Sequence, residues 1–263
     1  MSVPLPSLRE ATTGPVRWLI ADNPRRLNAF TFAMWSALPG LVAEAVADPA
    51  IRVIVLRGAG ERAFSAGADI SEFETARTVD KAAAYDKVNN EAFAAVAHAA
   101  KPTIAMIHGI CMGGALEIAL CCDLRLCDEG ALLAVPAAKL GIGYNPRWYR
   151  PLLSVVSAAR AKEILFTGAK FPSAAAARMG LVNRVHATAD LEAATIALAE
   201  ELAANAPLSI LAAKRCIDAF VEQPGMTDLA PLDALVDACF ASEDYIEGRR
   251  AFMEKRRPKF EGR

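Results

Sequence analysis

The chain has 263 residues, enough for one large domain with a buried core or for one domain with a small appendage. Its net charge of −1 gives no general attraction to nucleic acid or to acidic membranes. No apolar run approaches the roughly 18 residues of a membrane span. The opening stretch MSVPLPSLRE also lacks the basic and apolar regions of a secretory signal. We therefore expect a cytoplasmic protein.

The cysteines and histidines do not form a metal-binding pattern. The cysteines have no C-x-x-C spacing and lie mostly among apolar neighbours, so we expect reduced, buried, small apolar side chains. They are Cys111, Cys121, Cys122, Cys127, Cys216 and Cys239. The histidines (His98, His108 and His186) are not spaced for shared ligation, so no metal site is expected.

The first part of the chain alternates short apolar runs with helical patterns. VRWLIA (16–21) predicts a strand, and DNPRRLNAF follows as a loop that leads into a helix ending near Ala47. The β-branched run IRVIVLRG (51–58) predicts a buried strand. Residues 59–73, rich in Gly and Ala, predict a loop.

The alternation continues to about residue 136 and then gives way to helices. The expected elements are a helix over 80–99, a buried strand over 103–109, a helix from the Gly113–Gly114 pair, and strands at DLRLC and ALLAV. From Ala158 onward almost everything reads as helical, with breaks at Pro172, Pro207 and Pro224. Strand–helix alternation of this kind predicts an α/β fold with a mainly parallel sheet.

Two motifs in the 58–67 region imitate known sites. GAGERA (58–63) has the spacing of a dinucleotide fingerprint, but no helical pattern follows to bind a pyrophosphate. AFSAG (63–67) imitates a serine nucleophile elbow, but Ser65 is expected in a loop several residues beyond its strand. Neither motif predicts a site.

Glu117 is the most informative residue of the chain. It lies in a helix that is apolar on nearly all sides, GICMGGALEIALCCD (109–123), so we expect the helix to be buried. Burial raises a carboxyl pKa toward neutrality, which suits general acid–base catalysis. On this helix alone, a structural glutamate that bonds a loop or an ion-pair partner is an equal alternative.

The glycine pair before Glu117 favours the catalytic alternative. The first N–H groups of the helix have no partner within it, and residues without Cβ atoms let a ligand oxygen approach them. Glu117 lies about one turn, roughly 5 Å, further along the axis. A backbone N–H and a proton-transferring group would then lie side by side, as enolate chemistry requires.

Several longer stretches resemble the crotonase (enoyl-CoA hydratase/isomerase) superfamily. They are NPRRLNAF, FSAGADI (64–70), TIAMIHGICMGGALEIALCCD (103–123), ILFTGAKFPSAAAARMGLVNRV and SEDYIEGRRAFMEKRRPKF. The resemblance implies a spiral of ββα units with a C-terminal helical region. It implies an acyl-CoA-binding core over residues 1–200 and a trimerisation region over 201–263, assembled as a homotrimer or hexamer. It also implies a lyase or isomerase of lipid metabolism.

The same resemblance assigns roles to individual residues. The N–H groups of Ala68 and Gly114 would bind the thioester carbonyl oxygen, and Glu117 would be the acid–base group. The residues implied at coenzyme A, which enters only as part of the substrate, are Arg25, Arg26, Leu27, Ala66, Asp69, Ile70 and Gly113. Phe252 and Lys255 would reach the coenzyme A of a neighbouring subunit.

The chain departs from the hydratases at Ala137, in AVPAAKLGIGYN, where they carry a second glutamate. Glu117 alone makes two-glutamate hydration, and isomerisation that depends on the second glutamate, less favoured. The GIGYN segment with Tyr144 resembles methylmalonyl-CoA decarboxylase, in which a phenol could orient a departing carboxylate. That resemblance also includes a histidine where this chain has Ala68, and Tyr144 could simply line the pocket.

Three functions therefore remain open. The first is an enzyme of the enoyl-CoA hydratase type, and the second is a decarboxylase or another enolate-forming lyase. The third is a weakly catalytic relative that binds coenzyme A or RNA. Only the basic tail EKRRPKFEGR supports RNA binding, and such a tail is also typical of a solvated helix end.

Overall fold

A six-stranded sheet forms the centre of the molecule in the computed structural model, which describes residues 5–72 and 82–263. Its order is β1 (Ser7–Thr13), β2 (Val16–Asp22), β3 (Val53–Gly58), β5 (Thr103–Ile107), β7 (Leu124–Asp128) and β10 (Arg184–His186). All pairs are parallel except β1 with β2. The prediction of a mainly parallel α/β fold is confirmed.

A second, smaller sheet carries the loops that surround Glu117. It consists of β4 (Ala63–Ser65), β6 (Ile110–Met112), β8 (Leu132–Ala134) and β9 (Phe171–Pro172). The first three of these strands run parallel, and β9 pairs antiparallel with β8. The β4 strand corrects the expectation of an unbroken loop over 59–73, and it places Ser65 at a strand end.

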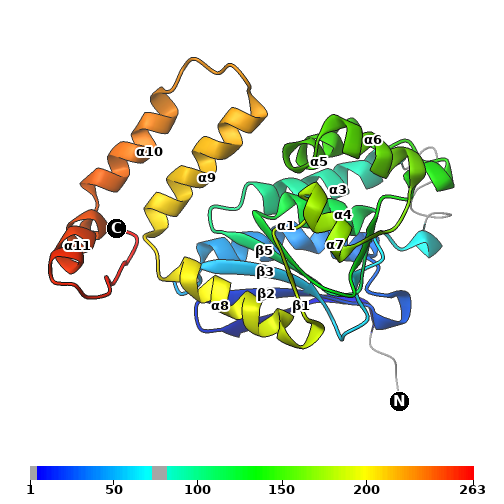
Figure 1. The fold of residues 1–263 in the computed structure, drawn as a ribbon, viewed down its shortest axis with the longest axis horizontal. Coiled ribbons are helices and arrows are strands. Elements are labelled where there is room, and N and C mark those ends of the chain that lie inside the picture. The colour runs from blue at the N-terminus through cyan, green and yellow to red at the C-terminus, as the bar shows by residue number, and fades with distance from the viewer. Residues whose placement is uncertain (1–4, 73–81) are drawn as a thin grey trace.

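Helices cover both faces of the central sheet (Figure 1). Together with the two sheets they form what we call the body. They are α1 (Phe32–Ala47), α3 (Ala82–Ala97), α4 (Gly114–Cys121), α5 (Tyr149–Val155), α6 (Ala158–Thr167), α7 (Ser173–Met179) and α8 (Leu191–Ala203). Short 3-10 turns are η1 (Pro24–Arg26), η2 (Ile70–Glu72), η3 (Ala137–Leu140), η4 (Pro146–Trp148) and η5 (Thr188–Asp190).

The strands alternate their side chains between two apolar cores because successive residues of a strand point to opposite faces. Ala105 and Ile107 pack with α1, α3 and α4, whereas Ile104 and Met106 pack with Leu198 of α8. Both faces are therefore buried, which explains the nearly continuous apolar runs of β3 and β5.

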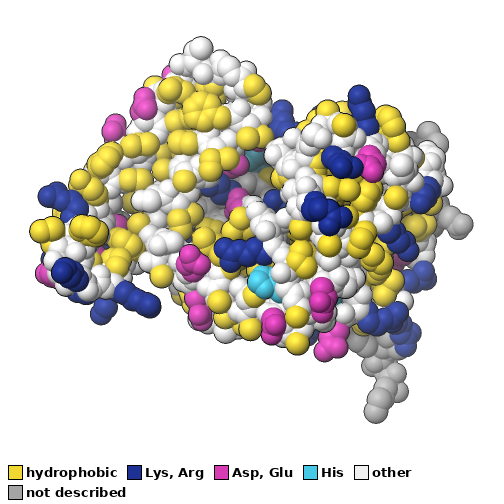
Figure 2. Space-filling model, viewed as in Figure 1, with side chains coloured by type: hydrophobic (Ala, Val, Ile, Leu, Met, Phe, Trp, Pro, Cys, Tyr) yellow, Lys and Arg dark blue, Asp and Glu magenta, His cyan; other side chains and the backbone are white. Residues whose placement is uncertain are grey.

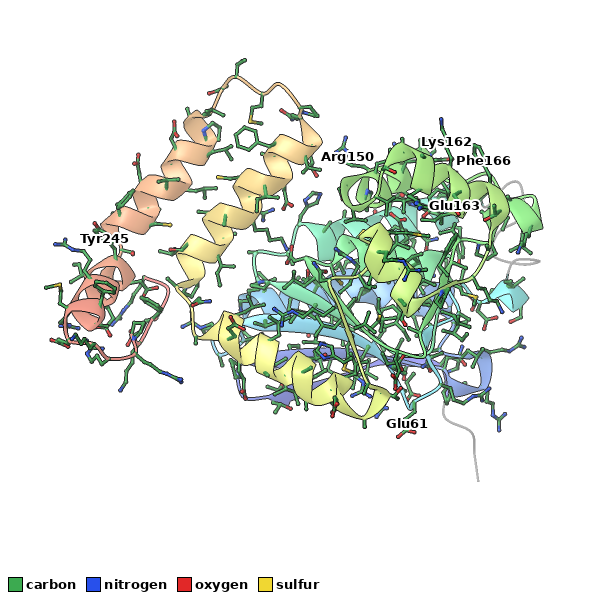
Figure 3. The ribbon with its side chains drawn as sticks, viewed as in Figure 1. Glu61, Arg150, Lys162, Glu163, Phe166 and Tyr245 are labelled. Carbon is green, nitrogen blue, oxygen red and sulfur yellow. The ribbon has the colours of Figure 1, made fainter. Side chains whose placement is uncertain are left out.

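Three further helices, which we call the arm, stand away from the body (Figure 1). They are α9 (Pro207–Glu222), α10 (Ala230–Ala241) and α11 (Glu243–Met253). Hydrophobic side chains gather over the arm (Figure 2), and Phe220, Phe240 and Phe252 are at least half exposed. Figure 3 shows Arg150 on the side of α5 toward α9, where it pairs with Glu222 at 3.8 Å.

The segment after α11, which we call the tail (254–263), is mostly exposed but makes specific contacts with the rest of the chain. It folds back, so that Asp244 accepts hydrogen bonds from the N–H groups of Glu261 and Gly262 at 2.7 and 2.9 Å. Arg52 of the body donates to the Phe260 carbonyl at 3.2 Å. The tail therefore links the arm to the body.

Across residues 5–72 and 82–263, no single helix is long and apolar enough to cross a membrane, although one bent pair of helices passes by length and composition.

Candidate functional site

The residue before helix α4, Gly113, has a backbone conformation that favours glycine. Gly113 caps the helix with φ 57° and ψ −125°, in the left-handed region that residues with Cβ atoms avoid. Its N–H donates to the Ala134 carbonyl at 2.8 Å, which ties the helix start to β8. Glu117 follows in the first turn and is only 1% exposed. The predicted buried glutamate at a Gly-Gly helix start is confirmed.

Gly67 brings a second backbone segment against this helix start. Its φ is 98°, and a Cβ atom there would lie 2.6 Å from the Met112 carbonyl oxygen and 3.3 Å from the Gly114 nitrogen. Because the next residue, Ala68, follows this close approach directly, the amides of Ala68 and Gly114 belong to adjoining segments.

The amides of Ala68 and Gly114 donate no hydrogen bond within the described part of the chain. Phe30 donates to the Gly67 carbonyl at 2.7 Å and accepts from the Asp69 N–H at 2.8 Å, so the Ala68 N–H points away from Phe30. Among the described residues, neither the Ala68 nor the Gly114 amide donates a hydrogen bond. Two backbone donors thus remain free beside the start of α4.

Burial controls the ionisation of Glu117. Loss of solvent raises its pKa from 4.5 to about 8, and a hydrogen bond from Tyr144 partly opposes this rise. The Tyr144 hydroxyl donates to Oε2 of Glu117 at 2.5 Å. The other carboxyl oxygen, Oε1, is buried and has no hydrogen-bond partner within the described part of the chain. The carboxyl is therefore largely protonated at neutral pH.

Tyr144 belongs to an aromatic cluster that closes one side of the site. Its ring meets the rings of Trp148 and Tyr149 edge-on, with centroids 5.4 and 5.3 Å apart. Trp148 in turn meets Phe93 of α3 at 5.5 Å. Trp148 and Tyr149 are thus direct neighbours of Tyr144.

Two residues of α3 that the sequence did not single out hold the Tyr144 loop. Asn90 accepts from the Trp148 indole N–H at 2.9 Å, and Asp86 accepts from the Asn145 side-chain amide at 3.2 Å. In the sequence both resemble solvent-facing polar residues of an amphipathic helix. No local signal identifies them, because their partners lie more than 50 residues further along the chain.

The residues expected near coenzyme A come together on the other side of Gly67. The Ala66 N–H donates to the Leu27 carbonyl at 2.9 Å, so the arginine loop lies against the loop after β4. Arg25 and Arg26 are exposed on η1. Asp69 is buried and Ile70 is 58% exposed.

Asn28 fixes this arginine loop. Its side-chain amide donates to the carbonyls of Ala59 and Ala63 at 2.9 and 2.7 Å, and its Oδ1 accepts from the Asn23 N–H at 3.2 Å. Asn28 is 1% exposed with φ 56°, a conformation that asparagine tolerates better than most residues. The Asn28 side chain therefore adds to the backbone bonds that hold the loop.

Two expected residues lie elsewhere in the same chain. Phe252 is on α11 and is 82% exposed, and Lys255 follows it in the tail with φ 54°. Figure 1 shows α11 at the far end of the arm from α4. One chain therefore does not bring Phe252 or Lys255 to Glu117.

The two imitation motifs carry no site geometry. After β3 the chain turns into β4 without a helix, as expected for GAGERA. Ser65 is fully buried, and its hydroxyl accepts from the Gly67 N–H at 3.1 Å.

Ala137 stands on η3 and is half-buried. Among residues 5–72 and 82–263, no group of three or more His, Cys, Asp or Glu side chains could hold a metal ion.

The chain belongs to the enoyl-CoA hydratase/isomerase family, because the model of that family matches residues 16–263. The mixed α/β fold with its parallel sheets is accordingly the crotonase fold that the sequence resemblance implied.

Individual relatives agree with this family. A putative enoyl-CoA hydratase/isomerase family protein from Hyphomonas neptunium has 41% identity and a TM-score of 0.93, with 98% of each chain covered. A short-chain-enoyl-CoA hydratase of Clostridium acetobutylicum is 31% identical, over 93% of each chain. A carnitinyl-CoA dehydratase of Salmonella typhi is 33% identical, over 98% of this chain and 99% of its own.

Proposed function

We propose that the protein is an acyl-CoA thioester enzyme of the enoyl-CoA hydratase type. The observation that carries the proposal is the position of Glu117, a buried carboxyl with a pKa of about 8 beside two free backbone amides. The short-chain-enoyl-CoA hydratase and carnitinyl-CoA dehydratase relatives support the same reaction type.

In this proposal the N–H groups of Ala68 and Gly114 donate to the thioester oxygen as negative charge develops on it. Fixed donors of this kind are worth roughly 3–4 kcal/mol each in a water-excluded site. The ionised Glu117 takes a proton from water while the hydroxyl adds to the β-carbon. The same carboxyl then delivers the proton to the α-carbon of the enolate. The double bond is consumed, one water is added, and the carboxylate is regenerated.

The coenzyme A part of the substrate would lie along the arginine loop. Arg25 and Arg26 are exposed there, and guanidinium groups bind phosphate oxygens through charge-assisted hydrogen bonds. Leu27, Ala66, Asp69 and Ile70 would line the adenine and pantetheine, and Gly113 would permit close approach to α4. No separate cofactor is proposed.

The arm would serve in assembly as a homotrimer or hexamer. Its exposed apolar residues, including Phe240 and Phe252, support burial against other copies. Phe252 and Lys255 could then reach a neighbouring subunit's site. Light scattering after size exclusion tests this, and a monomer at micromolar concentration would argue against it.

The test of the proposed reaction follows loss of the conjugated thioester absorbance of crotonyl-CoA. We expect wild-type turnover to rise with pH toward a plateau above pH 8, because ionised Glu117 accepts the water proton. Glu117→Gln should lower kcat by about 100-fold or more. Glu163→Gln, in an exposed ion pair on α6, is the matched control and should keep full activity. Equally negligible rates for wild type and Glu117→Gln would refute the proposal.

A decarboxylase is the second candidate, and the burial that raises the pKa of Glu117 to about 8 favours it. A protonated Glu117 presents no negative charge to a malonyl-type carboxylate and could protonate the enolate left after CO₂ departs. Release of CO₂ from methylmalonyl-CoA or malonyl-CoA would support this candidate. Absence of turnover with every carboxyacyl-CoA tried would remove it.

A further inference from the structure

We infer that Tyr144 is a positioning residue for Glu117, and that Oε1 is the carboxyl oxygen that exchanges a proton with the substrate. The inference rests on the acid–base role proposed for Glu117. It adds which atom transfers the proton and which neighbouring groups hold that atom in place.

The two oxygens of Glu117 have different surroundings. Oε2 accepts from the Tyr144 hydroxyl, whereas Oε1 is buried with no partner among the described residues. Because a phenol O–H already points at Oε2, the acid proton of the neutral carboxyl belongs on Oε1. A buried polar atom without a partner is costly, which is explained if the substrate supplies the missing partner.

The Tyr144 phenol is itself held by contacts outside the site. The Asn145–Asp86 and Trp148–Asn90 hydrogen bonds attach the segment that directly follows Tyr144 to α3. The edge-on contacts with Trp148 and Tyr149 limit rotation of its ring. Tyr144 therefore reaches Glu117 in one orientation, and α3 determines that orientation.

Three other titratable groups near Glu117 have their pKa raised by burial. Within α4, Cys121 faces Glu117, and burial raises the pKa of this thiol well above 9. Burial also raises the pKa of the Cys111 thiol on β6. Burial and the nearby Glu117 raise the pKa of the Tyr144 hydroxyl. Tyr149 at the start of α5 meets the Tyr144 ring, and Asp86 on α3 bonds the neighbouring Asn145.

The main experiment titrates Glu117 without substrate. Protein labelled with ¹³C at glutamate carboxyls is followed by NMR against pH, and the Glu117 resonance is the one missing in Glu117→Gln. Because the Tyr144 hydrogen bond lowers the Glu117 pKa, Tyr144→Phe should raise it by about one unit. Tyr149→Phe keeps the edge-on ring but has no bond to Glu117, so it should leave the pKa unchanged.

Phenylalanine keeps the ring contacts of Tyr144, and unchanged circular dichroism and melting will verify that the variant folds. An unchanged Glu117 pKa in folded Tyr144→Phe would overturn the inference. So would an equal shift in Tyr149→Phe.

Kinetics provide a second readout. Tyr144→Phe should lower kcat about tenfold or more, leave KM within about twofold, and move the pH profile upward with the NMR pKa. Asn90→Ala, which frees Trp148, should reproduce part of the kcat loss. A loss that appears only in KM would overturn the positioning role. If wild type turns over no acyl-CoA, the proposed function fails, while the substrate-free titration still tests whether Tyr144 positions Glu117.

Discussion

The raised pKa of Glu117, the acid beside the free amides, makes the stability of the fold depend on pH. Its folded-state pKa of about 8 exceeds its ordinary value of 4.5. Between these values the folded chain holds a proton that the unfolded chain has released. The contribution of Glu117 to stability is therefore present at low pH and is lost as pH rises through 8.

A stability measurement can detect this cost. Between pH 5 and pH 8 the linkage lowers the free energy of unfolding by about 3 kcal/mol. Glu117→Gln removes the ionisation and should remove that part of the pH dependence. Urea unfolding of both proteins at pH 5 and pH 8, at equal protein concentration, gives the comparison. Parallel pH dependence of the two proteins would contradict the prediction.

At the residue scale, the sequence predicts that Glu117 is buried at a helix start, but it does not predict the hydrogen bond from Tyr144. An acid in an apolar helix after two glycines is a local pattern, and local patterns can be read directly. The bond from Tyr144 depends on where Asn90 and Trp148 meet, and 58 residues separate these two. Such a contact is set by packing of the whole body.

At the element scale, the junction of β4 with α4 depends on Gly67. Its φ of 98°, and the 2.6 Å that would separate a Cβ atom there from the Met112 carbonyl oxygen, leave no space for a side chain.

Elements with weak patterns are harder to predict. The sequence does not indicate β1, because its last five residues are exposed, or β6, because it has only three residues. The strand β10 lies in the region whose sequence reads as almost wholly helical.

Gly67→Ala should therefore both destabilise the protein and displace the Ala68 amide. We expect a loss of about 3 kcal/mol in unfolding free energy and a large loss of turnover. Gly60→Ala is the control for backbone strain without a steric clash. Gly60 has φ 68°, and no atom lies within 4 Å of its Cβ position. That control should cost about 1 kcal/mol and retain activity. Equal effects of the two substitutions on turnover would contradict this explanation.

At the scale of the whole molecule, the tail is one link between the arm and the body, beside the ion pairs of Lys214 with Asp123 and of Arg150 with Glu222. Asp244 is 4% exposed and accepts two backbone hydrogen bonds from the tail. The periodic helix patterns of the arm were predictable. The return of the tail was not, because a run of basic residues gives no indication that it will pair with Glu247 and Glu254.

Asp244→Ala should release the tail without unfolding the sheet. Amide hydrogen exchange in residues 254–263 should become at least about tenfold faster, while β3 and β5 keep their protection. Glu243→Ala removes only an exposed ion pair with Arg263 and should change exchange little. Unchanged protection of the tail in Asp244→Ala would show that other contacts hold it.

The bond from Arg52 to Phe260 also has a consequence for synthesis. It joins residues 208 positions apart, and residues 256–263 leave the ribosome after both segments that they connect. The sheet can therefore form before the tail has emerged, whereas the Arg52 bond to the tail forms only once residue 260 has emerged. A ribosome-stalled nascent chain lacking these residues would carry a folded body whose arm is attached through α9 but not through the tail.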